Sequence, residues 1–310
     1  MTSRVREGQT FGGASRITAY VNFVKLPHTV FALPFALVGV VLASYRYRLR
    51  LADVGWVVLA FTAARFAAMA FNRIADREID ARNPRTAMRE LPRGVLSSTE
   101  AWVSVIMSVG VFAFAAAQLN RLCLLLSPLA IAWVLFYSFT KRFTRWSHLV
   151  LGVGLGIAPV GGYLAITGTW SRPWWMLVAL AAAVTTWVGG FDILYSLQDA
   201  EFDRAQSLHS VPAAMGEAGA ITVARVLHAL TVVFFALVGV ATHEGWLYWF
   251  GVAVAAAILL YEHSLVRPGD LSKLDAAFFA MNGMLSITFF FFVLAERVRP
   301  FLALALRPER

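Results

Sequence analysis

The stretch FNRIADREID, residues 71–80, ends a long apolar run and carries Asn72, Asp76 and Asp80 at four-residue intervals. Residues four apart share one face of a helix. Like charges at that spacing repel each other, and carboxylates at the end of a membrane helix are costly. A divalent cation offsets this cost, and oxygen-only ligands favour magnesium. We therefore expect a membrane helix that ends at a metal site.

A second stretch repeats this pattern. LYSLQDAEFD, residues 194–203, also ends an apolar run and carries Asp199 and Asp203, with Asp192 shortly before it. The repeat favours two four-helix halves plus one extra span. Two carboxylate clusters that face one cavity can clamp both ends of a diphosphate through magnesium ions. The alternative for each pair is a solvated loop charge that is neutralised by neighbouring arginines.

The composition indicates a membrane protein. Of the 310 residues, 59% are hydrophobic and 15% are charged, and the mean hydropathy is +0.67. A soluble domain of this size cannot hide so much apolar surface from water. The net charge of +9 lies in short clusters between apolar runs, so we expect membrane lipid and no nucleic acid as a partner. The single cysteine, Cys123, excludes a disulfide framework and a cysteine-based metal site.

Hydropathy predicts an all-α integral membrane protein with about nine transmembrane helices, because each span needs about 20 apolar residues. We expect one membrane domain over residues 1–310, with a cytoplasmic segment at 1–25 and a C-terminal tail at 297–310. The polar, basic N-terminal segment predicts no cleavable signal peptide. The predicted spans lie at 27–45, 51–72, 99–118, 121–139, 148–167, 173–195, 219–241, 244–261 and 276–296.

The three longer polar connections follow even-numbered spans and therefore lie on one side of the membrane. They cover residues 73–98, 196–218 and 262–275. Lysine and arginine are more frequent on this side than on the other, so the positive-inside rule places both acidic stretches at the cytoplasmic face. The basic C-terminus, on the opposite side, is the exception to this pattern.

Further candidate site residues lie in or near the predicted spans. Tyr137, Lys141 and Arg142 (YSFTKR) close the fourth span on the side of the acidic stretches. The cations can hold a departing diphosphate, or they can anchor the helix beside an interfacial tyrosine. Arg65 lies inside the second span, where a charge indicates a functional site. It can pair with Asp192, or it can bind the carboxylate of an aromatic acid.

Histidines and glycines give weaker signals. The histidines form no ligand pair at four-residue spacing, so we interpret them as interfacial or core residues and not as metal ligands. They are His28, His148, His209, His228, His243 and His263. The glycines of the fifth span follow no predicted strand and indicate close helix packing or room for an isoprenoid tail. They are Gly152, Gly154, Gly156, Gly161 and Gly162.

Three motifs together resemble the UbiA-type prenyltransferase family, in the 4-hydroxybenzoate polyprenyltransferase-like group. NRIADREIDARNPRTAMRELPRG (residues 72–94) resembles the family's first motif, DILYSLQDAEFD (192–203) its second, and YSFTKR (137–142) a third, Tyr-x-x-x-Lys. The resemblance covers almost the whole chain. It implies nine helices around a central cavity that opens sideways to lipid.

The resemblance also implies a role for each candidate residue. Lys141, with Tyr137 and Arg142, would contact the diphosphate. Arg65 matches an arginine linked to the aromatic acceptor, and Asp192 matches an aspartate that assists proton loss. One departure is Arg73, which stands where many members have Asp or Glu. Magnesium and diphosphate would be held by Asn72, Asp76, Asp80, Asp199 and Asp203.

The resemblance therefore implies magnesium-dependent transfer of a polyprenyl group from its diphosphate to a 4-hydroxybenzoate-like acid in quinone biosynthesis. Prenylation of a menaquinone-pathway aromatic acid is an alternative. The segment KLPHTVFALPFA (residues 25–36) is similar to bacterial members, which implies a bacterial inner membrane. A transporter of a cation or a phosphorylated lipid is a further alternative, although carboxylates gathered on one face favour an enzyme. The Asp-Gly-x-x-Ala-Arg pattern of CDP-alcohol phosphotransferases is absent.

Overall fold

The computed structural model describes residues 16–24, 26–274 and 277–305, and within these ranges the chain forms helices and no β-strand. Predictions that fall on residues 1–15, 25, 275–276 and 306–310 lie outside the described residues. The elements are α1 (Arg16–Phe23), α2 (Leu26–Ala43), α3 (Leu51–Ala75), α4 (Arg77–Arg82), α5 (Ser98–Leu119), α6 (Arg121–Thr140), α7 (Ser147–Thr167), α8 (Trp175–Ser196), η1 (Leu197–Asp199), α9 (Ala200–Ala205), α10 (Val211–Thr242), α11 (Trp246–Leu265), η2 (Ala277–Met281) and α13 (Asn282–Ala305).

Among the described residues, eight helices are long and apolar enough to cross a membrane. Helix α2, with 18 residues, takes the place of the first predicted span. The prediction of an all-helical membrane protein with about nine spans is therefore confirmed.

Two helices extend beyond the predicted boundaries. Helix α10 begins at Val211 and not at residue 219, because the Ser210 side chain caps its first turn by accepting a hydrogen bond from the Ala213 amide. Gly216, with φ of 69°, interrupts this helix near its start, so the apolar run alone marks only its later part. Helix α13 continues to Ala305, where a tail from residue 297 was predicted.

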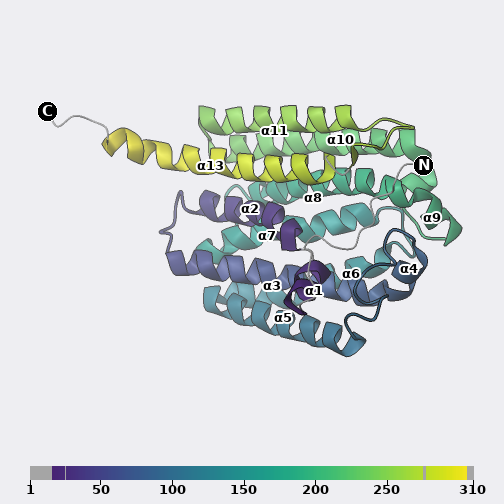
Figure 1. Cartoon of the computed structure of the whole chain (residues 1–310). Helices are drawn as coiled ribbons and strands as arrows, with labels where there is room; N and C mark the ends of the chain where they lie inside the picture. Colours follow the sequence, from purple (N-terminus) through teal and green to yellow (C-terminus); the bar gives the residue numbers. More distant parts are fainter. Residues whose placement is uncertain (1–15, 25, 275–276, 306–310) are drawn as a thin grey trace.

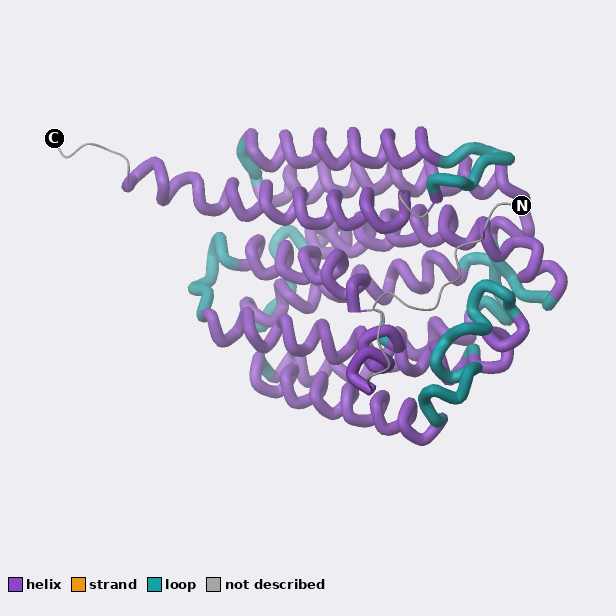
Figure 2. The backbone as a smooth tube through the Cα atoms, viewed as in Figure 1, coloured by secondary structure: helices purple, strands orange, loops and turns teal. Residues whose placement is uncertain are grey.

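The long helices lie side by side (Figure 1), and the contacts between neighbours in sequence close into a ring, across which α2 also packs against α7. Contacts run from α2 through α3, α5, α6, α7, α8, α10 and α11 to α13, and α13 packs back against α2. The short helices α4 and α9 lie at the same end of the bundle, where the described loops between helices are longest (Figure 2). The polar segments of both acidic stretches therefore meet at one end.

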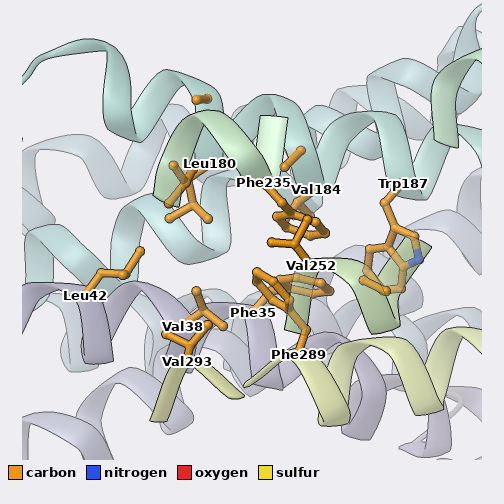
Figure 3. Close-up of a cluster of buried hydrophobic side chains, with 14 of the residues drawn as sticks. Phe35, Val38, Leu42, Leu180, Val184, Trp187, Phe235, Val252, Phe289 and Val293 are labelled. Carbon is orange, nitrogen blue, oxygen red and sulfur yellow. The ribbon is translucent and has the colours of Figure 1, made fainter. Parts of the chain in front are cut away.

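A core of aromatic and branched side chains holds the second half of the ring to α2 (Figure 3). The Phe35 ring of α2 lies 4.7 Å from the Trp187 ring of α8, and the stacked rings of Phe235 and Phe289 lie 4.1 Å apart. Trp187 is completely buried, and its indole N–H donates to the Asn282 side chain at 2.7 Å. Helix α8 is thus the apolar centre that positions the second acidic stretch.

Each acidic stretch breaks its helix at its first aspartate. Asp76 separates α3 from α4 with φ/ψ of −98°/5°, and Asp199 separates η1 from α9 with φ/ψ of −102°/0°. The helical spacing is kept across the break, because the Asp76 amide donates to the Asn72 carbonyl oxygen at 2.9 Å and the Asp80 amide donates to the Asp76 carbonyl oxygen at 2.7 Å. The matching dihedral angles show that the two stretches share a local structure as well as a sequence pattern.

Glycines of α7 allow its backbone to approach the neighbouring helices closely. A Cβ atom added at Gly156 would lie 2.7 Å from the Ala181 carbonyl oxygen of α8, and one added at Gly162 would collide with the Ala36 carbonyl of α2. The prediction of close helix packing is confirmed at these positions. By contrast, a Cβ atom at Gly161 would have no atom within 4 Å.

We predict that Gly156→Ala destabilises the protein by about 1–3 kcal/mol, because overpacking against a backbone carbonyl forces α7 away from α8. The measurement is the thermal unfolding midpoint in detergent. Gly161→Ala is the matched control, since it adds the same methyl group to open space and a better helix former to the same helix. An equal loss in both variants would show that close packing at Gly156 does not limit stability.

Candidate active site

A polar cavity of about 190 Å³ opens at the end of the bundle where the acidic stretches meet. Side chains from α3, α4, α6, α7, α8 and α9 line it, so both halves of the chain contribute. Arg65 and Arg142 are not among the lining residues. The predicted site residues that line it are Asn72, Asp76, Asp80, Tyr137, Lys141, Asp192, Asp199 and Asp203.

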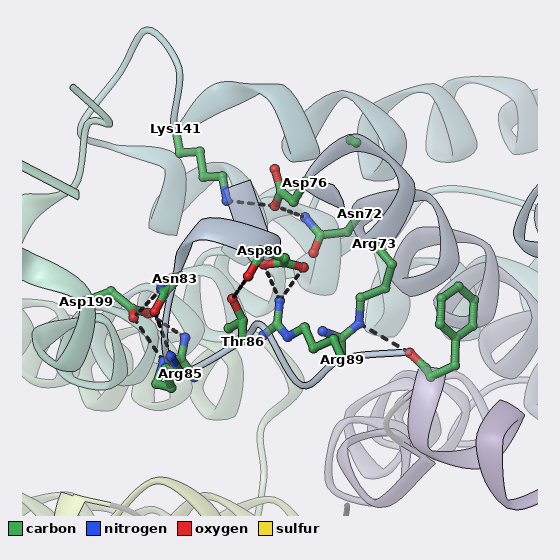
Figure 4. Close-up of polar contacts among 12 residues, drawn as sticks. Asn72, Arg73, Asp76, Asp80, Asn83, Arg85, Thr86, Arg89, Lys141 and Asp199 are labelled. Atoms are coloured by element: carbon green, nitrogen blue, oxygen red, sulfur yellow. Dashed lines mark hydrogen bonds and ion pairs between the residues drawn. The ribbon is translucent and has the colours of Figure 1, made fainter. Parts of the chain in front are cut away.

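Asp76 accepts hydrogen bonds from three different side chains, and its own side chain is only 4% exposed. Lys141 Nζ donates to its Oδ2 at 2.7 Å, and Asn72 Nδ2 donates to the same oxygen at 3.1 Å (Figure 4). Arg142 donates to Oδ1 at 3.2 Å and also to the Ala75 and Ser138 carbonyl oxygens. Arg142 therefore joins the end of α6 to the end of α3.

Asp80 and Asp199 each bind an arginine from the loop that follows α4. Arg89 NH1 lies 2.8 Å from both carboxylate oxygens of Asp80. Arg85 donates from Nε to Asp199 Oδ1 at 2.9 Å and from NH2 to Oδ2, so the pair is bidentate. Asn83 adds a third hydrogen bond to Asp199 at 2.9 Å. The loop of the first acidic stretch thus holds the aspartate of the second (Figure 4).

Asp192 and Arg65 do not pair with each other. Asp192 Oδ2 lies 2.7 Å from His148 Nδ1, on the cavity wall formed by α7 and α8. Arg65 lies near Tyr137, and its buried Nε has no hydrogen-bond partner within residues 16–24, 26–274 and 277–305. The predicted alternative in which Arg65 pairs with Asp192 is therefore not found. The Arg65 guanidinium keeps an N–H group that can donate to another acceptor.

The donor set suits magnesium, since five aspartates with oxygen ligands line one cavity. In this structure three of them are neutralised by cations: Asp76 by Lys141, Asp80 by Arg89, and Asp199 by Arg85. No group of three or more acidic, histidine or cysteine side chains converges on a metal position in the described part of the chain. Binding of an ion therefore requires these carboxylates to leave their cations, which become available to a phosphate group.

The sequence model of the UbiA prenyltransferase family matches residues 32–292. The chain belongs to the UbiA prenyltransferase family. Membership of this family identifies the protein as an enzyme, a prenyltransferase, and rules out the alternative of a transporter. Two curated relatives are named 4-hydroxybenzoate octaprenyltransferase. The one from Xanthomonas euvesicatoria pv. vesicatoria is 31% identical and covers 73% of this chain and 75% of the relative. The one from Methylobacillus flagellatus is 31% identical, and the match covers 79% of this chain and 84% of the relative.

Solved structures of UbiA homologues share the fold. The apo structure of a UbiA homolog from Aeropyrum pernix K1 is 34% identical, with a TM-score of 0.76, covering 88% of this chain and 98% of that one. A UbiA homolog from Archaeoglobus fulgidus bound to DMAPP and Mg²⁺ is 19% identical, with a TM-score of 0.70 and coverage of 90% and 98%. The second likeness shows the fold alone.

The sequence did not assign individual roles to several polar residues that line the cavity. Asn83, Arg85 and Arg89 lie within the first motif but without a predicted contact, and the prediction for His148 was an interfacial or core residue. Their place in the cavity depends on how the loop after α4 folds, and on α7 packing beside α8. The spacing of Arg85 and Arg89, four residues apart directly after the acidic stretch, was the one available signal.

The unusual Arg73 of the first motif does not line the cavity. Its side chain is buried and points away from Asp76 and Asp80, toward α1 (Figure 4). The Arg73 Nε donates to the Phe23 carbonyl oxygen at 3.5 Å. Arg73 therefore contributes to the contact between α3 and α1 and not to the cavity.

We predict that Arg85→Gln loosens the contact between the two acidic stretches, because it leaves Asp199 without its bidentate partner. Backbone amide hydrogen exchange of residues 83–97 and 199–210 should become faster. Arg82→Gln is the control, since Arg82 also joins the two stretches, by an exposed hydrogen bond to Gln206 at 3.0 Å. If amide hydrogen exchange is equally fast in both variants, the buried Arg85–Asp199 pair is not the main contact between the two stretches.

Proposed function

We propose that this protein transfers a polyprenyl group from a polyprenyl diphosphate to an aromatic acid of the 4-hydroxybenzoate type, with Mg²⁺, in quinone biosynthesis. The observation that carries the proposal is the convergence of Asp76 and Asp199, from opposite halves of the ring, on one cavity with Lys141. This arrangement suits a diphosphate, which needs divalent cations and ammonium or guanidinium groups at both ends.

The comparisons support the proposal at two points. The curated relatives named above carry the name 4-hydroxybenzoate octaprenyltransferase, which matches the donor and acceptor classes proposed here. The Archaeoglobus homologues were solved with DMAPP and Mg²⁺ and with GPP and Mg²⁺. Their bound prenyl diphosphates fit the use that we propose for the acidic cavity of this chain.

Bound Mg²⁺ would neutralise the charge that develops on the leaving diphosphate. Asp76, Asp80, Asp199 and Asp203 would hold the ions, and Asn72 would orient the first of these carboxylates through its hydrogen bond. Lys141, with Tyr137 beside it, would turn from Asp76 to the diphosphate and stabilise it as the allylic C–O bond breaks. The arginines released from Asp80 and Asp199 add further donors, and Arg142 braces α6 against α3.

The aromatic acceptor would lie on the side of the cavity nearest Arg65. The guanidinium of Arg65 has donor capacity for a carboxylate, which it can bind bidentately. This contact would place the electron-rich ring carbon against the allylic cation. Asp192, which lines the same cavity, would then accept the ring proton.

We also propose that the cavity faces the cytoplasm of a bacterial inner membrane. The short helices and loops at the cavity end carry basic residues, as the positive-inside rule requires of a cytoplasmic side: Arg77, Arg82, Arg93, Arg145 and Arg204. The curated relatives come from bacteria, which supports the inner membrane. A cytoplasmic opening would give soluble aromatic acids direct access.

We predict that Asp76→Asn and Asp199→Asn each abolish most turnover, by more than the roughly 10- to 100-fold typical of losing a supporting group around a metal. The assay is product mass after incubation with Mg²⁺, geranyl or longer diphosphates and a panel of aromatic acids. Asp53→Asn is the control, because Asp53 is a buried aspartate paired with Arg50 at the opposite end of α3. Full activity in either site variant would refute the metal assignment.

We predict that Arg65→Met raises KM for the aromatic acid roughly 10- to 100-fold, because a hydrogen bond to a charged group contributes about 1.5–3 kcal/mol. The KM for the prenyl diphosphate should stay unchanged, since Arg65 does not line the carboxylate cavity. Steady-state kinetics with each substrate varied in turn separate the two effects. An equal rise in both constants would argue that Arg65 supports the fold of the site and does not bind the acceptor.

A further inference from the structure

His148 and Asp192 form a pair on the cavity wall in which one partner is buried and the other is open. The His148 side chain is 5% exposed and the Asp192 side chain is 22% exposed. His148 is the second residue of α7, and Asp192 lies one turn from the end of α8, so the pair links the two helices. Because the ring is enclosed, it can fix the orientation of the carboxylate.

The second ring nitrogen of His148 shows which nitrogen carries the proton. The Val211 amide, at the start of α10, lies 3.5 Å from Nε2. A backbone amide can only donate a hydrogen bond, so Nε2 presents its lone pair, and the proton of the neutral ring lies on Nδ1. His148 therefore donates from Nδ1 to Asp192 Oδ2 over 2.7 Å.

This hydrogen bond occupies one carboxylate oxygen and leaves the other for chemistry. Asp192 Oδ1 accepts no hydrogen bond from the residues that the structure describes, and Asp192 lines the cavity. Three of the other cavity carboxylates differ, because Asp76, Asp80 and Asp199 each accept hydrogen bonds from a lysine or an arginine on their oxygens. Asp192 is thus held by a neutral partner and keeps an unshared oxygen.

We propose that His148 is a positioning residue that aims Asp192 Oδ1 at the ring proton of the aromatic acceptor; this inference rests on the proposed function. After the allylic carbon bonds to the ring carbon, the C–H bond at that carbon breaks. Its electron pair restores the aromatic ring, and the proton passes to Asp192 Oδ1. His148 holds the opposite oxygen during this transfer and exchanges no proton itself.

Two amide variants separate this role from a purely structural one. In His148→Asn the side-chain N–H takes the place of Nδ1–H and keeps the contact with Asp192. In His148→Gln the longer amide reaches the position of Nε2, where its oxygen can accept from the Val211 amide, and the contact with Asp192 is lost. Both side chains are polar and of similar size, so both variants should fold.

The experiment measures kcat, KM for the prenyl diphosphate, and the isotope effect with an acceptor deuterated at the prenylated ring carbon. We expect His148→Asn to stay near wild type. We expect His148→Gln to lose roughly 10- to 100-fold in kcat, part of what a positioned base contributes, with KM for the diphosphate unchanged. Its isotope effect should exceed that of the wild type, because proton loss becomes slow when Oδ1 is misaligned.

Equal kcat and equal isotope effects in His148→Gln and His148→Asn would overturn the inference while leaving the proposed function intact. Wild-type protein that forms no prenylated aromatic product would overturn both. His243→Asn serves as the control for histidine replacement as such. His243 is exposed at the opposite end of the bundle with φ of 55°, a conformation that asparagine adopts readily.

Discussion

The cost of placing carboxylates at the edge of a hydrocarbon bundle governs the rest of this structure. Asp76, Asp80 and Asp199 are each matched by a lysine or an arginine, and removing one partner of a buried pair costs roughly 3–5 kcal/mol. The chain meets this demand by drawing Arg85 and Arg89 into the cavity behind the first acidic stretch. Because Arg85 binds Asp199 of the other stretch, charge balance also joins the two halves of the ring.

The same pairing links stability to function. Cations that balance the carboxylates in this structure have the chemistry needed to hold a diphosphate, so in the proposed function ligand binding would exchange one set of ion pairs for another. Because each charged group would have an ionic partner both before and after this exchange, the protein avoids the free-energy cost of burying an unpaired charge. Asp76 and Asp199, where the two helices are interrupted, are themselves partners in these ion pairs, with Lys141 and Arg85.

The sequence predicted what depends on local pattern. Apolar runs set the membrane helices, and the spacing of Asp76, Asp80, Asp199 and Asp203 predicted which carboxylates share a cavity. The pattern did not predict the break at Asp76, because a backbone turn inside a polar stretch leaves the spacing of residues unchanged. His148 was missed for another reason. The role proposed for His148 depends on its Nδ1 atom lying 2.7 Å from Asp192 Oδ2 on a different helix, a contact that only helix packing creates.

The ring of helices has a consequence for how the chain is made. Helix α13 is translated after α2, and it packs against both α11 and α2, which lie far apart in the chain. Before α13 enters the membrane, the face of α2 that it later covers is open to lipid, while α3 and α7 already cover other faces of α2. Closure of the ring therefore depends on two helices that are inserted at different times, and each completes the protein environment of the other.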